Sequence, residues 1–400
     1  MITITKNQEA FLQLASSATT NVFLSGKAGT GKSTIVKQLF RLWGEVGHKY
    51  VALAPTGIAA QNIEGQTIHS MFALQPFGIL DFDTCKSLSK EKRLLLTKAD
   101  SIVIDEVSML RPDILDAMHW TMSKSGIKGG LLSKHVVFIG DMKQLPVILS
   151  DNERAVLSEF YGGDTFDYAN VYAKLNVKNI ELDEIVRQND VEFITALNLV
   201  REGQKAPYFK QFVSHEPQGI ILCPHNTTVA EYNKKGLAEL PGRTVTYTAT
   251  IEGNAKADEF ALEPYIEVKH GAKIMYLVNS KDNPLRNGTL GTFWREVNEE
   301  GEEISYIKVA GVKYKLERTK FVKHKYIYNK EEDKLVLVET GSIEQMPIKL
   351  AYALSIHKSQ GLTFDEVTID LTLPCFVKGQ MYVALSRVTR PQGLRIIVNR

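Results

Sequence analysis

Cysteine and long apolar runs are both scarce in this chain of 400 residues. The three cysteines, Cys85, Cys223 and Cys375, are isolated and lack Cys-x-x-Cys spacing, which argues against a disulfide framework or a zinc site and favours a reducing compartment. No apolar run is long enough to cross a bilayer, and the first residues have no apolar core of signal-peptide length. We therefore expect a cytoplasmic protein with no membrane partner.

An excess of charge of one sign is also absent. Lysine and arginine number 48 against 46 aspartates and glutamates, so the overall charge neither requires nor excludes a nucleic-acid partner, and any basic surface must be local. The hydrophobic fraction of 44% and the charged fraction of 24% are those of an ordinary globular enzyme. The length allows two to four domains, and no internal repeat or low-complexity tract divides it.

The first motif with chemical meaning is a glycine-rich loop at 26–33, which reads G-x-x-x-x-G-K-S between an apolar run and a helical pattern. Its glycines allow backbone N–H groups to surround phosphate oxygens, and the following helix points its positive end at the same place. Lys32 would then reach the β and γ phosphates, and Ser33 would hold Mg²⁺. A glycine-rich turn that matches by chance is the lesser alternative. The predicted nucleotide-contacting residues are Gly26, Gly29, Thr30, Gly31, Lys32, Ser33 and Thr34.

Unalternated apolar runs separated by helical patterns predict an α/β fold with parallel sheets. The first set of strands is expected at 22–25, 50–54, 101–104 and 135–139, after a helix at 6–16. A second α/β unit is expected from strands at 180–182, 219–223, 366–371 and 394–398 and helices at 190–202, 226–239 and 378–387.

Two stretches interrupt this pattern. Residues 72–99 are longer than a normal α/β connection and carry Phe77 and Phe82 beside Pro76, as functional or disordered loops do. Residues 244–340 contain short β-type runs with turn residues between them, which predicts a small inserted barrel. Within it, 312–328 alternates basic and aromatic residues, typical of a nucleic-acid track but nearly as typical of a solvated strand face.

Two predicted strands end in polar residues suited to phosphate chemistry. The strand at 101–104 runs into Asp105 and Glu106, where a Mg²⁺ ligand and a water-activating base belong in phosphate-loop enzymes. A solvated acidic turn is the alternative. A later strand runs into Gln144, whose amide can accept from an attacking water and donate to a phosphate. We therefore predict Asp105 as the Mg²⁺ residue, Glu106 as the general base and Gln144 as the γ-phosphate sensor.

Eight motifs, in chain order, resemble those of the Pif-type, RecD-like branch of superfamily 1 DNA helicases. They lie at 26–33, 54–60, 65–70, 104–109, 140–146, 185–188, 353–361 and 380–387. The resemblance implies two RecA-like P-loop NTPase domains, a wedge insert and an inserted small SH3-like β-barrel. The boundaries that follow are 1–71 with 100–178, 72–99, 179–243 with 341–400, and 244–340.

The resemblance also assigns roles to single residues. Arg187 and Arg387 match positions that reach the γ phosphate from the second domain, where an arginine can be worth about 10³–10⁵ in rate; a surface ion pair is the alternative for either. Gln8 matches the adenine-reading glutamine, or is an ordinary helix residue, and Gly361 belongs to a nucleotide-contacting motif. The positions that face single-stranded DNA in the family correspond to Pro55, Thr56, Gly57, Thr67, His69, Asn226, His357, Lys358 and Ser359.

Together these patterns predict an ATP- and Mg²⁺-dependent DNA helicase. By resemblance it would act as a monomer, move 5′ to 3′ on single-stranded DNA and unwind duplex or junction DNA. Two alternatives stay open: a motor subunit of a nuclease or recombination complex, and a nucleotide-gated clamp that binds DNA without multiple turnovers.

Overall fold

The computed structural model describes residues 4–75, 78–147, 149–184, 190–260, 262–280, 282–297, 300–329, 331–332 and 334–399. The chain forms two units, 1–187 with 324–339 and 188–323 with 340–400. This division separates neither 72–99 from the first unit nor most of 244–340 from the second. None of the described helices is long and apolar enough to cross a membrane.

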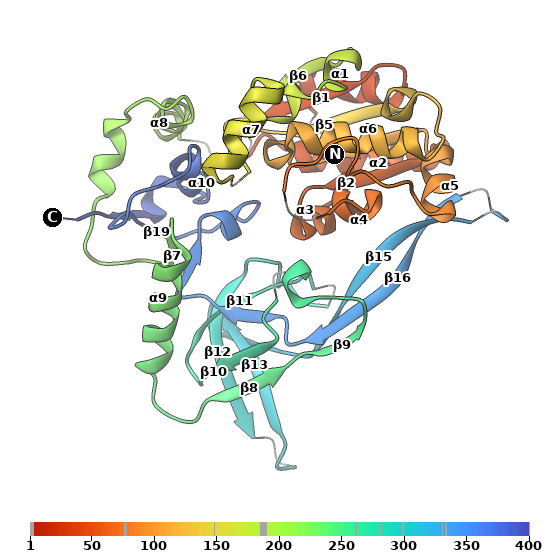
Figure 1. The fold of residues 1–400 in the computed structure, drawn as a ribbon. Coiled ribbons are helices and arrows are strands. Elements are labelled where there is room, and N and C mark those ends of the chain that lie inside the picture. The colour runs from red at the N-terminus through yellow and green to blue at the C-terminus, as the bar shows by residue number, and fades with distance from the viewer. Residues whose placement is uncertain are drawn as a thin grey trace. The chain divides into compact units, whose positions relative to one another are not determined.

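The first unit is built on a six-stranded parallel sheet with the order β3-β2-β4-β5-β1-β6. Figure 1 labels β1, β2, β5 and β6 of this sheet. Its strands are β1 (Val22–Gly26), β2 (Tyr50–Ala54), β3 (Gln66–Thr67), β4 (Ser101–Ile104), β5 (His135–Gly140) and β6 (Lys178–Leu182). Every residue of β4 and β5 is buried, because helices cover both faces of the sheet. The four strands expected from apolar runs are therefore confirmed.

Strand β6 corrects one prediction, because the sequence analysis assigns 180–182 to the second α/β unit. The strand pairs in parallel with β1 instead, with Gly26 opposite Leu182. Most of its residues are exposed, as at the edge of a sheet, and Asn7 Nδ2 donates a hydrogen bond to the Glu181 carbonyl at 3.0 Å. The place of β6 in the first sheet depends on this pairing and not on a buried apolar run. The amino-acid composition of the strand therefore did not indicate which sheet it joins.

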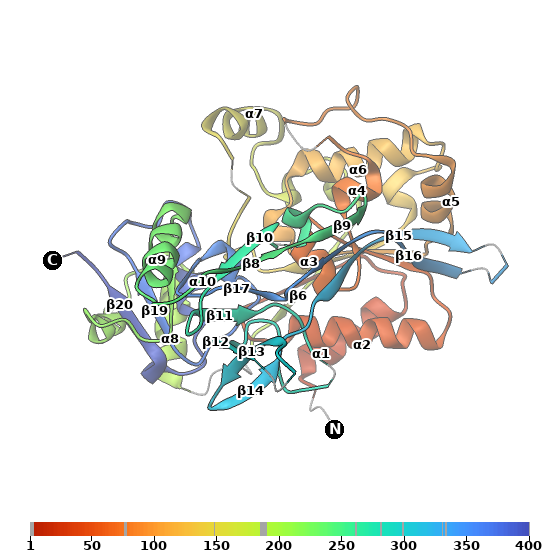
Figure 2. The same cartoon turned by 90° about the horizontal axis from the view of Figure 1, so that it is seen from below.

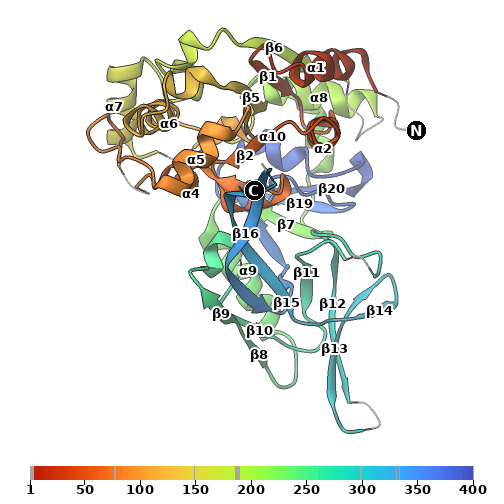
Figure 3. The same cartoon turned by 90° about the vertical axis from the view of Figure 1, so that its right-hand side faces the viewer.

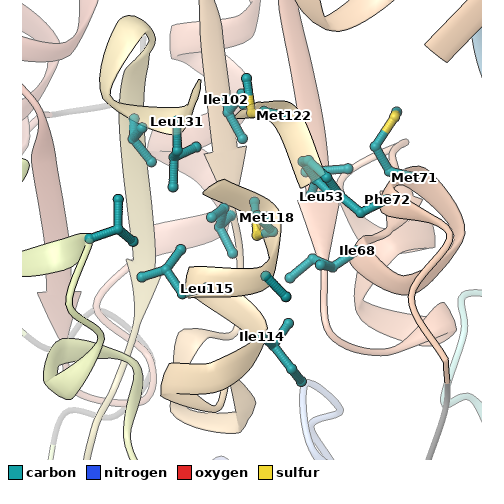
Figure 4. Close-up of a cluster of buried hydrophobic side chains, with 14 of the residues drawn as sticks. Leu53, Ile68, Met71, Phe72, Ile102, Ile114, Leu115, Met118, Met122 and Leu131 are labelled. Carbon is teal, nitrogen blue, oxygen red and sulfur yellow. The ribbon is translucent and has the colours of Figure 1, made fainter. Parts of the chain in front are cut away.

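Helices of the first unit lie on both sides of the sheet (Figure 2). Two separate apolar clusters fill the space between these helices and the strands. One cluster joins Phe11, Leu39 and Trp43 to Leu24 of β1. The other joins the opposite face to Leu115 and Met118, among the residues drawn in Figure 4. The helices are α1 (Lys6–Ser16), α2 (Lys32–Glu45), α3 (Gly57–Asn62), α4 (Ile68–Phe72), α5 (Lys90–Lys98), α6 (Pro112–Lys124) and α7 (Asp151–Tyr161).

Residues 78–99 pack into this second cluster. Leu80, Leu95 and Leu96 are buried in it together with residues of β2 and β4. Two residues of the α6 N-terminus anchor the segment: the Leu80 N–H donates to Asp113 Oδ2 at 2.9 Å, and Arg111 Nη2 donates to the Gly78 carbonyl at 2.6 Å. The segment is therefore part of the packed first unit, whereas Pro76 and Phe77 lie outside the described residues.

The second unit contains a four-stranded parallel sheet with the order β18-β7-β19-β20. Its strands are β7 (Ile220–Cys223), β18 (Ala353–Ser355), β19 (Val367–Asp370) and β20 (Leu394–Ile397), with helices α8 (Val191–Arg201), α9 (Asn226–Ala238) and α10 (Gln380–Leu385). The predicted strands at 219–223, 366–371 and 394–398 and all three helices agree with it. Strand β18 was not predicted, because three residues give too short an apolar run.

Short strands between β7 and β18 form three sheets with the orders β10-β8, β14-β13-β12-β11-β17 and β15-β16-β9. Figure 3 shows β11, β12 and β13 side by side. Ile266, Phe293 and Ile307 belong to one apolar cluster that joins the first two sheets. The strands are β8 (Val245–Thr248), β9 (Thr250–Gly253), β10 (Tyr265–Val268), β11 (Lys273–Tyr276), β12 (Leu290–Val297), β13 (Glu303–Val309), β14 (Val312–Lys315), β15 (Thr319–Asn329), β16 (Lys334–Gln345) and β17 (Ile348–Leu350).

Several connections contain a short 3₁₀ helix. These are η1 (Val107–Met109), η2 (Gly130–Ser133), η3 (Phe166–Tyr168), η4 (Tyr172–Lys174), η5 (Pro207–Phe212), η6 (Ala257–Phe260), η7 (His357–Ser359) and η8 (Pro391–Gly393).

Candidate nucleotide and nucleic-acid sites

The glycine loop between β1 and α2 has a backbone that requires its glycines. Gly31 precedes α2 in the left-handed region at φ 82°, where a side chain is strained. A Cβ on Gly26 would lie 2.8 Å from Thr30 Oγ1 and 2.9 Å from Leu182 Cβ, so β6 leaves no room for one. The loop therefore has the tight, side-chain-free turn that a phosphate cradle needs.

The reactive side chains of the loop lie at the start of α2. Lys32 Nζ folds back over the loop and donates to the carbonyls of Gly26 at 2.6 Å and Lys27 at 3.1 Å. Ser33 and Thr34 are exposed in the first turn of this 14-residue helix, at its positive end. An ammonium group, a hydroxyl and a helix N-terminus thus gather where a triphosphate and its cation would bind.

Gln8 lies against the same loop. Its Oε1 accepts from the Thr5 N–H at 3.1 Å in a capping box, and its Nε2 donates to the Thr30 carbonyl at 3.2 Å. The amide oxygen therefore caps α1, and the amide nitrogen links α1 to the glycine loop. The structure places Gln8 beside this loop, and its contact with a base remains a prediction.

Strand β4 delivers two carboxylates to the same edge of the sheet, because β1, β4 and β5 are parallel. Asp105 Oδ1 accepts from the Glu106 N–H at 2.8 Å. Burial and then the charge of Glu106 raise the pKa of Asp105, whereas the charge of Lys32 opposes this rise. A divalent cation would keep both carboxylates ionised, and oxygen ligands from Asp105 and Ser33 are of the type that Mg²⁺ prefers. The residues present therefore fit Mg²⁺.

Glu106 also has an unusual backbone. Its φ of 53° and ψ of 45° lie in the left-handed region, which costs a non-glycine residue about 1–2 kcal/mol. Residues held in such conformations are concentrated at functional sites. This strain is a second observation, independent of the motif, that favours Glu106 as a catalytic candidate.

Gln144 follows β5 at this edge. It is 8% exposed, and its Nε2 donates to Asp141 Oδ2 at 3.4 Å. Asp141 is itself buried, and its other oxygen accepts from the Lys143 N–H at 3.1 Å. Asp141 thus positions the predicted sensor, a role that the sequence analysis missed although Asp141 directly follows the strand.

The predicted DNA residues of the first unit lie at the ends of β2 and β3. Thr56 and Thr67 both cap helices, since each Oγ1 accepts a backbone N–H at 3.3 Å, from Ala59 and from Ser70 respectively. His69 is half-buried, and burial together with Arg111 lowers its pKa. The remaining two, Pro55 and Gly57, flank Thr56. Capping alone accounts for the two threonines, so their contact with DNA stays a prediction.

The predicted DNA residues of the second unit follow β7 and β18, which are parallel neighbours. Asn226 and Lys358 are exposed, and His357 is half-buried with a pKa lowered by burial. Ser359 differs from the others, because its side chain is fully buried and its Oγ donates to the Ile356 carbonyl at 2.8 Å, and its contact with DNA stays a prediction. Its hydroxyl closes the η7 turn and does not lie on the surface.

An exposed phenylalanine between β19 and α10 was missed by the sequence analysis. Phe376 is 53% exposed, and its ring centroid lies 4.9 Å from that of His225 and 6.1 Å from that of His357. The buried amide of Gln380 fixes its backbone, accepting from the Phe376 N–H at 3.0 Å and donating to the Pro224 carbonyl at 3.2 Å. A phenylalanine in a turn outside any apolar periodicity is the signal that could have found it.

Arg387 lies in an environment that differs from the predicted one. It is only 2% exposed, and its guanidinium donates to the carbonyls of Val383 at 2.9 Å and Leu362 at 3.1 Å and to Ser386 Oγ at 2.7 Å. In this conformation Arg387 joins α10 to the turn that contains Gly361. Gly361 is exposed, and its φ of 80° lies in the left-handed region. Arg187 lies outside the described residues.

The basic and aromatic run at 312–328 is partly described. Lys313 pairs with Glu296, and Lys315 Nζ lies 2.9 Å from Glu317 Oε1. Arg318 Nη1 donates to the Thr248 carbonyl at 2.9 Å. These internal partners favour the solvated strand face over a nucleic-acid track for this part of the run.

The sequence and the structure of this chain both resemble those of known proteins. A profile of the PIF1-like helicase family matches residues 3–208. The ATP-dependent DNA helicase Pif1 of Campylobacter jejuni is 32% identical, over 94% of this chain and 88% of that protein. The human ATP-dependent DNA helicase PIF1 is 30% identical, over 94% of this chain and 58% of that protein. The structure of Bacteroides sp. Pif1 in complex with ADP-AlF4 aligns with a TM-score of 0.85 at 31% identity, covering 99% of this chain and 92% of the other.

Proposed function

The chain belongs to the PIF1-like helicase family, and on that basis we propose that it is an ATP-driven DNA helicase that moves 5′ to 3′ on single-stranded DNA and unwinds duplex or junction DNA. One observation within the chain supports this most directly. Lys32, the acidic pair Asp105 and Glu106, and Gln144 follow parallel neighbouring strands at one edge of the first sheet. That arrangement suits phosphoryl transfer to water.

In the proposed site, Lys32 stabilises the β and γ phosphates, Glu106 takes a proton from the attacking water, and Gln144 orients that water. Mg²⁺, when bound to Ser33 and Asp105, supplies positive charge to the phosphate oxygens. The nucleotide contacts proposed are Gln8, Gly26, Gly29, Thr30, Gly31, Lys32, Ser33, Thr34 and Gly361. The Bacteroides complex with ADP-AlF4 shows that a relative binds a nucleotide of this kind.

We propose that Arg187 and Arg387 complete the γ-phosphate site. Arg387 can do so only by exchanging its internal acceptors, the carbonyls of Val383 and Leu362 among them, for phosphate oxygens. Such an exchange would rearrange the link between α10 and the turn at Gly361. Nucleotide state would thereby be coupled to the conformation of the second unit, through its different affinity for the two conformations.

The proposed DNA contacts are Pro55, Thr56, Gly57, Thr67, His69, Asn226, His357 and Lys358, joined by Phe376. Polar groups of these types contact phosphate and sugar without reading sequence, and an exposed aromatic ring stacks on any base. Relatives support a DNA substrate, since Bacteroides Pif1 has been solved bound to ssDNA. A further structure of relatives concerns DNA unwinding at forked dsDNA by two coordinating Pif1 helicases. We propose that the protein moves along single-stranded DNA as a monomer. The number of protein chains bound to each DNA fork can be measured directly.

We also propose that the chain has four parts, with 72–99 as a wedge and 244–340 as an SH3-like barrel. Phe82 is the described wedge candidate, because it is 50% exposed and is held by Lys124, whose Nζ lies 4.0 Å from the ring centroid. Opening a base-pair step costs about 0.6–2.2 kcal/mol, and stacking contributes about 1–3 kcal/mol per base. A stacking wedge could therefore bias strand separation.

The wedge assignment predicts that Phe82→Ala slows strand displacement several-fold and leaves DNA-stimulated ATP hydrolysis unchanged. Phe160→Ala, which removes an exposed ring from α7 of the same unit, is the matched control. Both rates are measured on one forked substrate. Equal loss of both activities in Phe82→Ala would show that the residue supports the fold instead.

Two alternative functions remain distinct from the helicase. A motor subunit of a nuclease or recombination complex would co-purify with a partner in fixed ratio. A nucleotide-gated clamp would bind single-stranded DNA but show no DNA-stimulated turnover of ATP beyond one cycle.

The deciding experiment is strand displacement on two duplexes that differ only in carrying a 5′ or a 3′ single-stranded tail. ATP-dependent displacement of the 5′-tailed substrate alone is expected, with the Lys32→Ala variant as the negative control. Displacement from the 3′ tail would reverse the proposed direction. Hydrolysis without displacement from either tail would favour the clamp or the partner-dependent motor.

A further inference from the structure

The second unit contains a groove of about 950 Å³ that the proposed function does not use. It is lined by residues that come just before strands of the parallel sheet: Gly219 before β7, Ala351 before β18, and Glu366 before β19. Residues of β11, β12 and β13 line its other side. We call it the amino-edge groove.

The position of the groove separates it from the proposed single-strand contacts. Asn226 and His357 follow the carboxyl ends of β7 and β18, whereas the groove lies at the amino ends of the same strands. In a parallel sheet these are opposite edges. A ligand in the groove therefore does not occupy the surface that holds Asn226, His357 and Phe376.

Lysines form a row across the sheet beside the groove. Lys273 on β11 is opposite Thr292 on β12, which is opposite Lys308 on β13, and Lys308 is opposite Lys313 on β14. Residues directly opposite one another share a face, and neighbouring strands are about 4.8 Å apart, so the backbones of the three lysines span about 14 Å of the sheet. Lys308 and Lys313 are like charges directly opposite one another, a pairing that destabilises a sheet, and Glu296 offsets part of this cost by pairing with Lys313. An anionic ligand beside Lys273 and Lys308 would offset more of it.

The charges that line the groove are mainly positive. Lys273, Arg286, Lys308 and Arg390 contribute cations, against Asp365 and Glu366. Within the described residues no carboxylate forms an ion pair with any of the four cations, whereas Glu366 Oε1 accepts from Gln218 Nε2 at 2.7 Å and Asp365 Oδ1 accepts from Thr389 Oγ1 at 3.2 Å. Lys313 pairs with Glu296, so it adds less to the field.

Two of the cations are held in place without losing their charge. Arg286 Nη1 donates to three backbone carbonyls, including those of Ser280 at 2.9 Å and Leu285 at 2.8 Å, and Lys308 Nζ lies 4.7 Å from the centre of the Trp294 ring. The other two, Lys273 and Arg390, are exposed. The groove thus combines fixed and accessible cations of the residue types, lysine and arginine, that contact phosphate oxygens.

We propose that the amino-edge groove binds the phosphodiester backbone of DNA outside the single-strand track. This rests on the proposed function, because a helicase at a junction meets DNA besides the strand on which it moves. Two sources share this chemistry: the duplex ahead of the motor and the displaced strand. The row of cations suits a polymer of regularly spaced charges, and contacts of this kind carry no sequence information.

The test compares Lys273→Ala/Arg390→Ala with a control, Lys205→Ala/Lys210→Ala, which removes two exposed cations elsewhere on the same unit. Affinity is measured without nucleotide, as a function of salt, for a single-stranded oligonucleotide, a 5′-tailed duplex and a fork with two tails. Each lost phosphate contact lowers the slope of log affinity against log salt by about 0.9 on duplex DNA and about 0.7 on a single strand. For the groove variant we expect the slope on the fork to fall by the equivalent of between one and two phosphate contacts. The slope on the single-stranded oligonucleotide should not change.

A decrease already present on the tailed duplex identifies the duplex as the ligand, and a decrease seen only on the fork identifies the displaced strand. The proposal is overturned if the slope on the fork is unchanged, if the control falls equally, or if the oligonucleotide slope falls too. The last result would place these residues in the single-strand track. Strand displacement by the unmodified protein tests the proposed helicase function separately, because the slopes require no ATP.

Discussion

Lys32 in the first unit and Arg387 in the second are both predicted to bind the γ phosphate, yet they are held very differently. Lys32 is half-buried and donates to carbonyls of the loop that would itself hold the phosphate. Arg387 is 2% exposed and donates to Val383 of α10, to Ser386 at the end of that helix and to Leu362 in the turn that follows Gly361. Lys32 needs only a local exchange of partners, whereas Arg387 needs its surroundings to change. A motif therefore identifies the residue type but not the conformation in which it acts.

The largest effect is expected at the local site. Lys32→Ala should lower ATP turnover by at least about 10²-fold, because it removes the ammonium that stabilises the phosphates, and should leave single-stranded DNA binding intact. Steady-state hydrolysis and fluorescence anisotropy with a labelled oligonucleotide measure the two properties. Hydrolysis at the wild-type rate would show that Lys32 does not act in hydrolysis. Lys32 could then no longer be compared with Arg387 as a γ-phosphate ligand.

Glu106→Gln should lower hydrolysis by about 10²–10⁴-fold while nucleotide binding is kept, because the amide has nearly the same shape but cannot take a proton. Binding of a fluorescent ATP analogue, compared with single-turnover hydrolysis, separates these effects. Loss of nucleotide affinity instead would make Glu106 a ligand or a structural residue. In that case Glu106, like Arg387, would contribute to the conformation of its unit as well as to hydrolysis.

The comparison is sharpened most by Arg387→Ala. We expect a modest loss of ATP affinity, loss of most hydrolysis, and a decrease in the free energy of unfolding of about 1.5–3 kcal/mol, because buried hydrogen bonds of a charged group are removed. Denaturant unfolding followed by circular dichroism gives the stability, and hydrolysis is measured under conditions where the variant is folded. Lower stability with normal hydrolysis would show that Arg387 is structural only.

The smallest effect concerns DNA rather than ATP. Phe376→Ala should weaken binding of single-stranded DNA by about 5- to 150-fold, the equivalent of about 1–3 kcal/mol of lost base stacking, and Phe376→Trp should retain it. Leu373→Ala is the control, because Leu373 is 45% exposed on the same connection but cannot stack. Equal weakening in both alanine variants would point to apolar contact or loop structure rather than to stacking.

The sequence predicted those parts of the fold in which local pattern and final environment coincide. Strands buried on both faces, such as β4 and β5, appear as apolar runs wherever their partners lie. Strand β6 is mostly exposed and depends on pairing with β1, so the predicted strand at 180–182 did not indicate the sheet to which it belongs. The packing of Leu80 into the first core depends on the distant Asp113, and no local pattern contains that hydrogen bond.

The same limit applies to the candidate sites. Spacing predicted the residue types at Lys32, Asp105 and Glu106, because a turn, a strand end and a helix start are local structures. Burial of Arg387 was not predictable, since an arginine without visible partners is expected at the surface. Exposure of Phe376 was missed for the opposite reason, because a phenylalanine is expected inside.

The left-handed backbone of Glu106 has a consequence for selection in the laboratory. Glycine, and to a lesser extent asparagine, adopts this conformation with less strain than glutamate, so Glu106→Gly relieves a conformational cost of about 1 kcal/mol or more. A library screened only for survival after heating would therefore enrich substitutions that remove the proposed base. Heat-selected descendants of this chain would keep the fold, bind nucleotide and fail to turn it over, unless activity is scored in the same round.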